Sequence, residues 1–226
     1  MVLKRILIMD PITLGLLVSG ALLLFGRSAR GDVPLTKVGG YTDVFDDVYR
    51  QECKSIPVAY LRSLAKHESD SNPAETTGGA WGLLQVWWAV PGSVLIDYNE
   101  RKGTAFTKND LLDPYINARL ACELLSRIKN YYGYMYRRAF PNPSWSHRRF
   151  VELVTMGWNV GWSHERGVGR VVSVLLGEGH TTDIDVAMIR QRAGGLPEVT
   201  DKARGFLPVS FARRVTSAYF TIAGQA

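Results

Sequence analysis

The sequence has few of the residues that build metal centres or disulfide networks, with only two cysteines and four histidines among 226 residues. The cysteines are too few for a disulfide framework, and the histidines do not have the spacing of zinc ligands. We find no internal repeat, no low-complexity tract and no run that alternates polar and apolar residues as a strand would. The sequence therefore predicts no metal and no cofactor, and it argues against a mostly-β or a repeat architecture.

The two cysteines, Cys53 and Cys122, allow two interpretations. The preferred one treats them as small, buried hydrophobic side chains. The alternative is a single disulfide, which requires an oxidising compartment.

Positive charge exceeds negative charge only moderately, with a formal net charge of +6. Half of this surplus lies in residues 1–31, where Asp10 is opposed by four basic residues, Lys4, Arg5, Arg27 and Arg30. The remaining surplus is scattered, whereas nucleic-acid binding usually needs a concentrated basic face. We therefore expect no nucleic-acid partner, and a weak attraction to an acidic polymer or an anionic membrane.

The N-terminal segment is almost wholly apolar from Ile6 to Gly26 and follows two basic residues. That length is just sufficient for a membrane-spanning helix with a cytoplasmic N-terminus. A cleaved signal peptide and a buried core helix are the alternatives. We expect residues 1–30 to be a membrane anchor or signal segment, residues 31–40 a linker, and residues 41–226 a domain in the periplasm. If a phage encodes the chain, the domain would instead be associated with the virion.

The rest of the chain is dominated by helical patterns. Apolar residues recur at intervals of three and four, and Asp113-Pro114 has the form of a helix start. The fold class is therefore mostly α, a single globule of packed helices. Helices are expected over Thr42–Cys53, Pro57–Ser69, Trp81–Tyr98 with a break near Pro91, from Pro114 past Ile128, and over Arg149–Trp158, Gly169–Leu176 and Pro208–Ile222.

Glu68 is the first candidate for chemistry, because it ends an apolar helix just before a loop that contains glycine. A carboxylic acid at such a junction would be partly desolvated, which favours the protonated form that a general acid requires. Taken alone, an ordinary exposed glutamate explains this pattern better.

Two further clusters are candidates for sugar binding. Gly82 and Gln85 stand among indole rings that can stack on sugars, those of Trp81, Trp87 and Trp88. Trp158 and Asn159 lie in a segment with a glycine on either side, which permits close approach of the backbone to a ligand. An aromatic core helix and a helix-ending turn are the structural alternatives.

The order and spacing of these motifs resemble the soluble lytic transglycosylase family, whose fold is akin to goose-type lysozyme. The resemblance covers about residues 55–215. The matching motifs are Glu68-Ser69, Asn72-Pro73, Gly79–Gln85 (Gly-Ala-Trp-Gly-Leu-Leu-Gln), Asp113–Asn117 (Asp-Pro-Tyr-Ile-Asn) and Gly157–Gly161 (Gly-Trp-Asn-Val-Gly).

The resemblance implies a lysozyme-like catalytic domain that cleaves the β-1,4 bond between N-acetylmuramic acid and N-acetylglucosamine in peptidoglycan. Glu68 would act first as general acid and then as general base, giving 1,6-anhydro ends. The residues implied in holding the glycan are Ser69, Gly82, Gln85, Trp158 and Asn159. The alternatives are hydrolysis of the same bond, with Asp70, Glu75 or Asp97 activating water, and a cell-wall-binding or assembly protein without activity.

The sequence departs from the family pattern at three positions. Leu84 replaces the usual methionine, and Trp158 replaces a tyrosine. Phe206 stands where the family often has another tyrosine, whose hydroxyl helps to orient the catalytic acid; Tyr219 is a candidate substitute. Small anchored enzymes of this kind serve secretion, conjugation or phage-entry complexes, which are therefore the expected partners besides peptidoglycan and the membrane.

Overall fold

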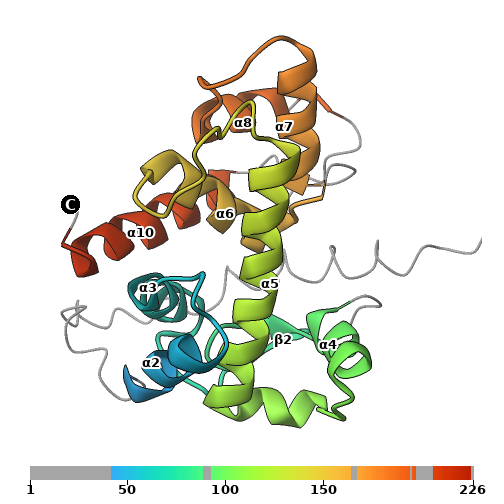
Figure 1. Cartoon of the computed structure of the whole chain (residues 1–226), viewed down its shortest axis with the longest axis vertical. Coiled ribbons are helices and arrows are strands. Elements are labelled where there is room, and N and C mark those ends of the chain that lie inside the picture. Colours follow the sequence, from blue (N-terminus) through green and yellow to red (C-terminus); the bar gives the residue numbers. More distant parts are fainter. Residues whose placement is uncertain (1–41, 89–92, 164–166, 194, 197–205, 225–226) are drawn as a thin grey trace, which may run out of the picture.

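The longest helix, α5 (Pro114–Met135), runs through the centre of the molecule and connects two groups of shorter elements (Figure 1). This computed structural model describes residues 42–88, 93–163, 167–193, 195–196 and 206–224. Asp113 caps α5, since its side chain accepts the backbone N–H groups of Tyr115 and Ile116. Pro114 follows at the first helical position, where its missing N–H has no consequence. The helix start predicted from the sequence is confirmed.

Elements on either side of α5 form the two groups. Near its N-terminal half lie α2 (Thr42–Gln51), α3 (Val58–Ser69), α4 (Val94–Lys102), the 3-10 helix η2 (Lys108–Leu112) and a small sheet. Around its C-terminal half lie α6 (Arg148–Val160), α7 (Gly167–Gly177) and α8 (Val186–Ala193). The last helix, α10 (Phe206–Ile222), packs against both α6 and α3 and so joins the two groups. The mostly-α fold class is confirmed.

The segment from Trp81 to Trp88 is not helical, contrary to the sequence prediction. It contains β2 (Ala80–Trp81) and β3 (Val86–Trp87), which form an antiparallel sheet with β1 (Thr76–Thr77) in the order β1-β2-β3. Gly82 and Gln85 take left-handed backbone angles, with φ of +80° and +49°, which end any regular helix. Strands of two residues are too short to show an alternating pattern, so the sequence did not reveal them.

Helix α8 was not predicted, although it carries recognisable signals. The carboxylate of Asp185 accepts the backbone N–H of Met188, as an N-cap does. Val186, Ile189 and Ala193 are buried on one face. The helix has only eight residues, too few for the periodic pattern to stand out.

The two cysteines are buried and joined, so the preferred interpretation as two free thiols is wrong. Cys53 and Cys122 form a disulfide with their Cα atoms 5.7 Å apart. The bond connects the chain just after α2 to the middle of α5, across 69 residues of sequence. It thereby ties the end of α2 to the centre of the fold.

The expected anchor at residues 1–30 and linker at residues 31–40 lie outside the described residues. Within the ranges that the structure describes, no helix has both the length and the apolar character needed to cross a membrane.

Removing the disulfide should lower stability without changing the fold. We expect the double variant Cys53→Ala/Cys122→Ala to lose about 3–4 kcal/mol of unfolding free energy, because the unfolded chain loses a cross-link that closes a long loop. Denaturant unfolding with and without dithiothreitol measures this. Reductant should destabilise the unchanged protein by a similar amount and leave the variant unaffected; equal sensitivity of both proteins would contradict the assignment.

Candidate active site

Glu68 is the penultimate residue of α3 and is half-buried. The helix ends immediately after it, because Asp70 adopts a left-handed conformation with φ of 54° and donates its backbone N–H to the carbonyl of Ala65. Ser71 is also left-handed, with φ of 62°. Glu68 thus lies at the carbonyl end of a helix, where the helix dipole disfavours a further negative charge.

Trp158 contacts Glu68 directly. Its indole Nε1–H donates a hydrogen bond of 2.7 Å to Oε1 of Glu68, from α6 to α3 across 90 residues of sequence. The sequence analysis assigned Trp158 to glycan binding and did not anticipate this bond. An indole N–H can only donate, so Oε1 of Glu68 must accept whether the acid is neutral or ionised.

Ser69 and Gln85 are both buried and both bind backbone carbonyl groups. The Ser69 hydroxyl donates to the carbonyl of Leu83 at 2.7 Å, which brings the β2–β3 loop against the end of α3. The Gln85 side chain donates from Nε2 to the carbonyls of Glu75 at 3.1 Å and Gly82 at 2.9 Å. In this structure, both side chains therefore build the loop next to Glu68.

Asn117 completes this loop, and the motif search did not assign it a role. Its side chain is fully buried on α5; Oδ1 accepts the N–H of Leu84 at 2.7 Å. Nδ2 donates to the carbonyls of Trp81 at 2.8 Å and Leu111 at 3.0 Å. A Cβ atom on Gly82 would lie 2.0 Å from the Leu111 carbonyl oxygen, so only glycine fits there. The Asp-Pro-x-x-Asn motif contained the signal for this role.

Asn159 is half-buried beside Trp158, one residue before the end of α6. Gly161 ends that helix with φ of +94°, as the helix-ending alternative predicted. The second half of the predicted site therefore comes from the last turn of α6. Of the predicted residues, the structure brings Trp158 into contact with Glu68. It places Gly82 and Gln85 in the β2–β3 loop, to which Ser69 at the end of α3 is hydrogen-bonded.

Two titratable neighbours of Glu68 are held neutral. Burial, and then the charges of Arg214 and Lys66, lowers the pKa of His67, so His67 adds no positive charge beside the acid at neutral pH. Burial above all, with a contribution from the charge of Glu68, raises the pKa of Tyr60 well above its ordinary range. The Tyr60 hydroxyl pairs with that of Thr155 at 2.9 Å.

The carboxylates proposed from the sequence as a second acid differ in their contacts. Asp70 forms an ion pair with Lys66. Asp97 is bound by Arg101 and Arg127; partial desolvation opposes these contacts, but together they lower the pKa of Asp97.

Glu75 differs from Asp70 and Asp97, since its carboxylate accepts the hydroxyl of Thr77 at 2.6 Å.

Among the described residues, no group of three or more acidic, histidine or cysteine side chains is placed to hold a metal ion.

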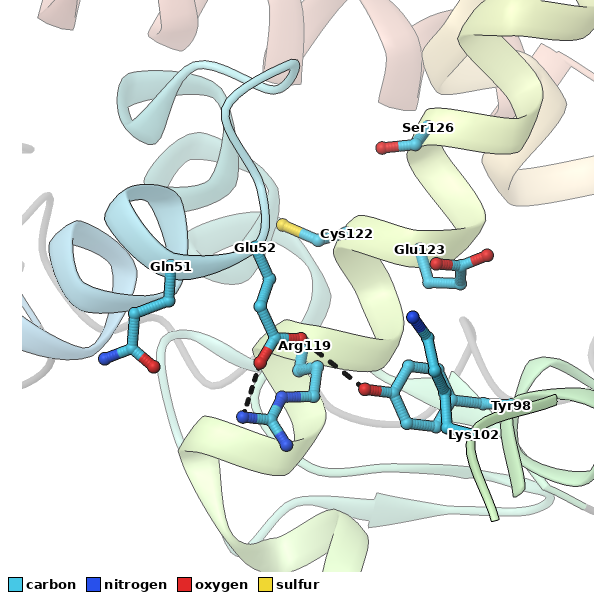
Figure 2. A pocket seen from close by; sticks show the side chains of 8 residues that line it. All are labelled: Gln51, Glu52, Tyr98, Lys102, Arg119, Cys122, Glu123 and Ser126. Atoms are coloured by element: carbon cyan, nitrogen blue, oxygen red, sulfur yellow. Dashed lines mark hydrogen bonds and ion pairs between the residues drawn. The ribbon is translucent and has the colours of Figure 1, made fainter. Parts of the chain in front are cut away.

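A polar cavity of about 480 Å³ lies elsewhere, between the end of α2, α4 and α5 (Figure 2). Glu52 and Arg119 form an ion pair of 2.6 Å in it, and the Tyr98 hydroxyl points at Glu52 from 3.5 Å. Cys122 of the disulfide forms part of its wall. Glu68 does not line this cavity. Of its charged side chains, Glu52 and Arg119 are paired with each other, and Glu123 is paired with Arg101 and Arg127. The candidate active site is therefore the region of Glu68.

The sequence analysis named two residues of α10, Phe206 and Tyr219, in connection with a tyrosine hydroxyl that would help to orient Glu68. The side chain of Phe206 lies outside the described residues. Tyr219 is buried and packs edge-on against Tyr60, with ring centres 5.9 Å apart. One donor that the structure places on Glu68 is the indole of Trp158.

The described part of the chain has the fold found in lytic transglycosylases. It is similar to the 70 kDa soluble lytic transglycosylase Slt70 of Escherichia coli, with a TM-score of 0.51 and 20% identity over 81% of this chain and 24% of that one. An inactive mutant of the lytic transglycosylase Slt from Pseudomonas aeruginosa also matches, with a TM-score of 0.49 and 15% identity over 82% of this chain and 25% of that one. The chain thus spans about a quarter of each.

By sequence, no protein-family model and no curated protein matches the chain.

Changing Asn117 to Asp should destabilise the loop. The substitution keeps the shape but replaces the donors to the Trp81 and Leu111 carbonyls with an oxygen, leaving two buried acceptors unpaired. We expect a loss of about 3 kcal/mol or more in unfolding free energy. Asn130→Asp, at an exposed position of the same helix, is the matched control in denaturant unfolding. A loss of similar size in both variants would argue against this role.

Proposed function

We propose that this protein is a peptidoglycan lytic transglycosylase in which Glu68 is the general acid and base. The observation that carries the proposal is the hydrogen bond from Trp158 to Glu68, which joins two motifs 90 residues apart at one carboxyl group. The lytic transglycosylase fold supports it. The loop held by Ser69, Gln85 and Asn117 forms one side of the site, and the end of α6 forms the other.

The chemistry needs one carboxyl group. Neutral Glu68 gives its proton to the glycosidic oxygen as the C1–O bond of the N-acetylmuramic acid breaks, and an oxocarbenium-like species forms. The resulting carboxylate takes the proton of the 6-hydroxyl, whose oxygen bonds to C1. The product is a 1,6-anhydro ring, and Glu68 is neutral again. Because Trp158 donates to Oε1, we assign the proton of the neutral acid to Oε2.

Glycan binding is proposed for the remaining predicted residues. Trp158 contacts Glu68 from α6, Asn159 follows it in that helix, and both side chains would contact the sugars. Gly82 allows the β2–β3 loop to lie close to them, and Ser69 and Gln85 keep that loop in place.

The disulfide supports a location outside the cytoplasm. Disulfides form and persist in oxidising compartments such as the periplasm, and peptidoglycan lies there too. We propose that residues 1–30 anchor the enzyme in the inner membrane, with the described domain on the periplasmic side. Such an enzyme would open local gaps in the cell wall for a secretion, conjugation or phage-entry complex.

Glu68→Gln should abolish cleavage while leaving the fold intact, because an amide cannot donate an acidic proton. A zymogram containing peptidoglycan measures the activity, and thermal unfolding checks the fold. We expect clearing by the unchanged protein and none by the variant. Full activity in the variant would remove Glu68 from the mechanism.

The products decide between lytic cleavage and hydrolysis. Glu75 motivates the hydrolytic alternative, since its carboxylate binds a hydroxyl and no cation among the described residues. Mass spectrometry of the digest should show anhydro ends, lighter than reducing ends by one water, and Glu75→Gln should leave the rate unchanged. Reducing ends together with an inactive Glu75→Gln variant would establish the hydrolase instead.

Trp158→Phe should slow cleavage by about 10- to 100-fold, which is part of the roughly 10²- to 10⁴-fold that a positioned general acid contributes. The phenyl ring preserves apolar packing but cannot donate to Oε1. Trp158→Tyr, which restores a donor, should recover part of the rate.

The matched control for that test is Trp162→Phe. Trp162 packs edge-on against Tyr131, with ring centres 5.0 Å apart, and lies just beyond α6. Rates should be measured on soluble glycan strands, with KM separated from kcat. Equal losses at the two tryptophans would mean that Trp158 acts through packing alone.

A further inference from the structure

Lys108, the first residue of η2, places its ammonium group over two indole rings. Its Nζ lies 5.4 Å from the ring centre of Trp81 and 5.0 Å from that of Trp88. The two rings stand edge to face, with centres 6.1 Å apart. Both distances are within the range in which the negative face of an aromatic ring attracts a cation.

The two halves of this cluster are fixed to each other by buried contacts. Asn117 binds the carbonyl of Trp81 in β2 and that of Leu111 in η2. The start of η2 is held by a capping box, in which Asp110 accepts both the backbone N–H and the hydroxyl of Thr107. The position of the Lys108 ammonium is therefore set by two anchored elements.

No residue that the structure describes forms an ion pair with Lys108, whose side chain is exposed. Of the nearby acids, Asp110 is bound to Thr107, and Asp113 caps α5. Indole rings orient a cation but carry no net charge, so the ammonium can still bind an anion.

The β2–β3 loop connects the cluster to the proposed active site. Trp81 lies two residues before Leu83, whose carbonyl accepts the hydroxyl of Ser69, the neighbour of Glu68. A glycan strand bound at Glu68 that continues over the β2–β3 loop would approach Lys108. In peptidoglycan, the acidic groups beside the sugars are the carboxylates of the peptides attached to N-acetylmuramic acid.

We propose that Lys108, held by Trp81 and Trp88, is a binding subsite for a carboxylate of the peptide stem. The inference rests on the proposed function and adds to it a preference for glycan that carries acidic peptides over neutral glycan. The attraction is electrostatic, so it should weaken as ionic strength rises.

The experiment uses the full chain with Glu68→Gln, which binds without cleaving. The ligands are a soluble tetrasaccharide muropeptide and the same molecule with its carboxylates converted to methylamides, both titrated by calorimetry. Lys108→Met and Lys108→Glu are compared with Lys54→Glu, a change at an exposed lysine for which the structure gives no ring contact.

We expect the acidic muropeptide to bind about tenfold more weakly to Lys108→Met and weaker still to Lys108→Glu. Affinity for the methylamide should be the same in all variants. Lys54→Glu should bind both ligands with the affinities of the parent, which is the chain that carries Glu68→Gln alone. Equal affinities of the parent for the two ligands, or equal losses for both in the Lys108 variants, would overturn this subsite alone. If the parent binds neither ligand, the proposed function fails with it.

Discussion

The side chain of Asn117 is the contact on which the site depends. One buried amide on α5 binds the backbone of Leu84, Trp81 and Leu111, and so fixes the β2–β3 loop and η2 against the central helix. Buried backbone groups that lose such partners are costly, and few other side chains can supply one acceptor and two donors. The loop then has the shape that allows Ser69 to bind it.

A second contact joins the two groups of elements that α5 separates. The bond from Trp158 on α6 to Glu68 on α3 crosses between them. Helix α10 packs along both α3 and α6 and supports this arrangement, with Tyr219 and Tyr60 in edge-on contact. The proposed acid is therefore oriented by a residue from the opposite group, and the spacing of the helices matters for its position.

Much of the helical framework could be predicted because its signals are local. Asp113-Pro114 marked the start of α5, and the apolar spacing of α3 and α6 matched their buried faces. The prediction failed where tertiary contacts decide the conformation. Trp81–Trp88 has the apolar composition of a core helix, yet Gly82 and Gln85 turn the chain so that Asn117 can bind it. Helix α8 was too short to be recognised.

The sequence by itself determined which residue types are present and in what order: the Glu-Ser pair, the glycine-bearing segment, the Asp-Pro-x-x-Asn start and the tryptophan-asparagine pair. Local propensity and spacing carry that information, since they depend on neighbours along the chain. Only the tertiary structure decided that Cys53 pairs with Cys122, that Trp158 donates to Glu68, and that Lys108 lies over two indole rings. Each of these contacts joins residues at least 20 positions apart, and their distances are set by how the helices pack.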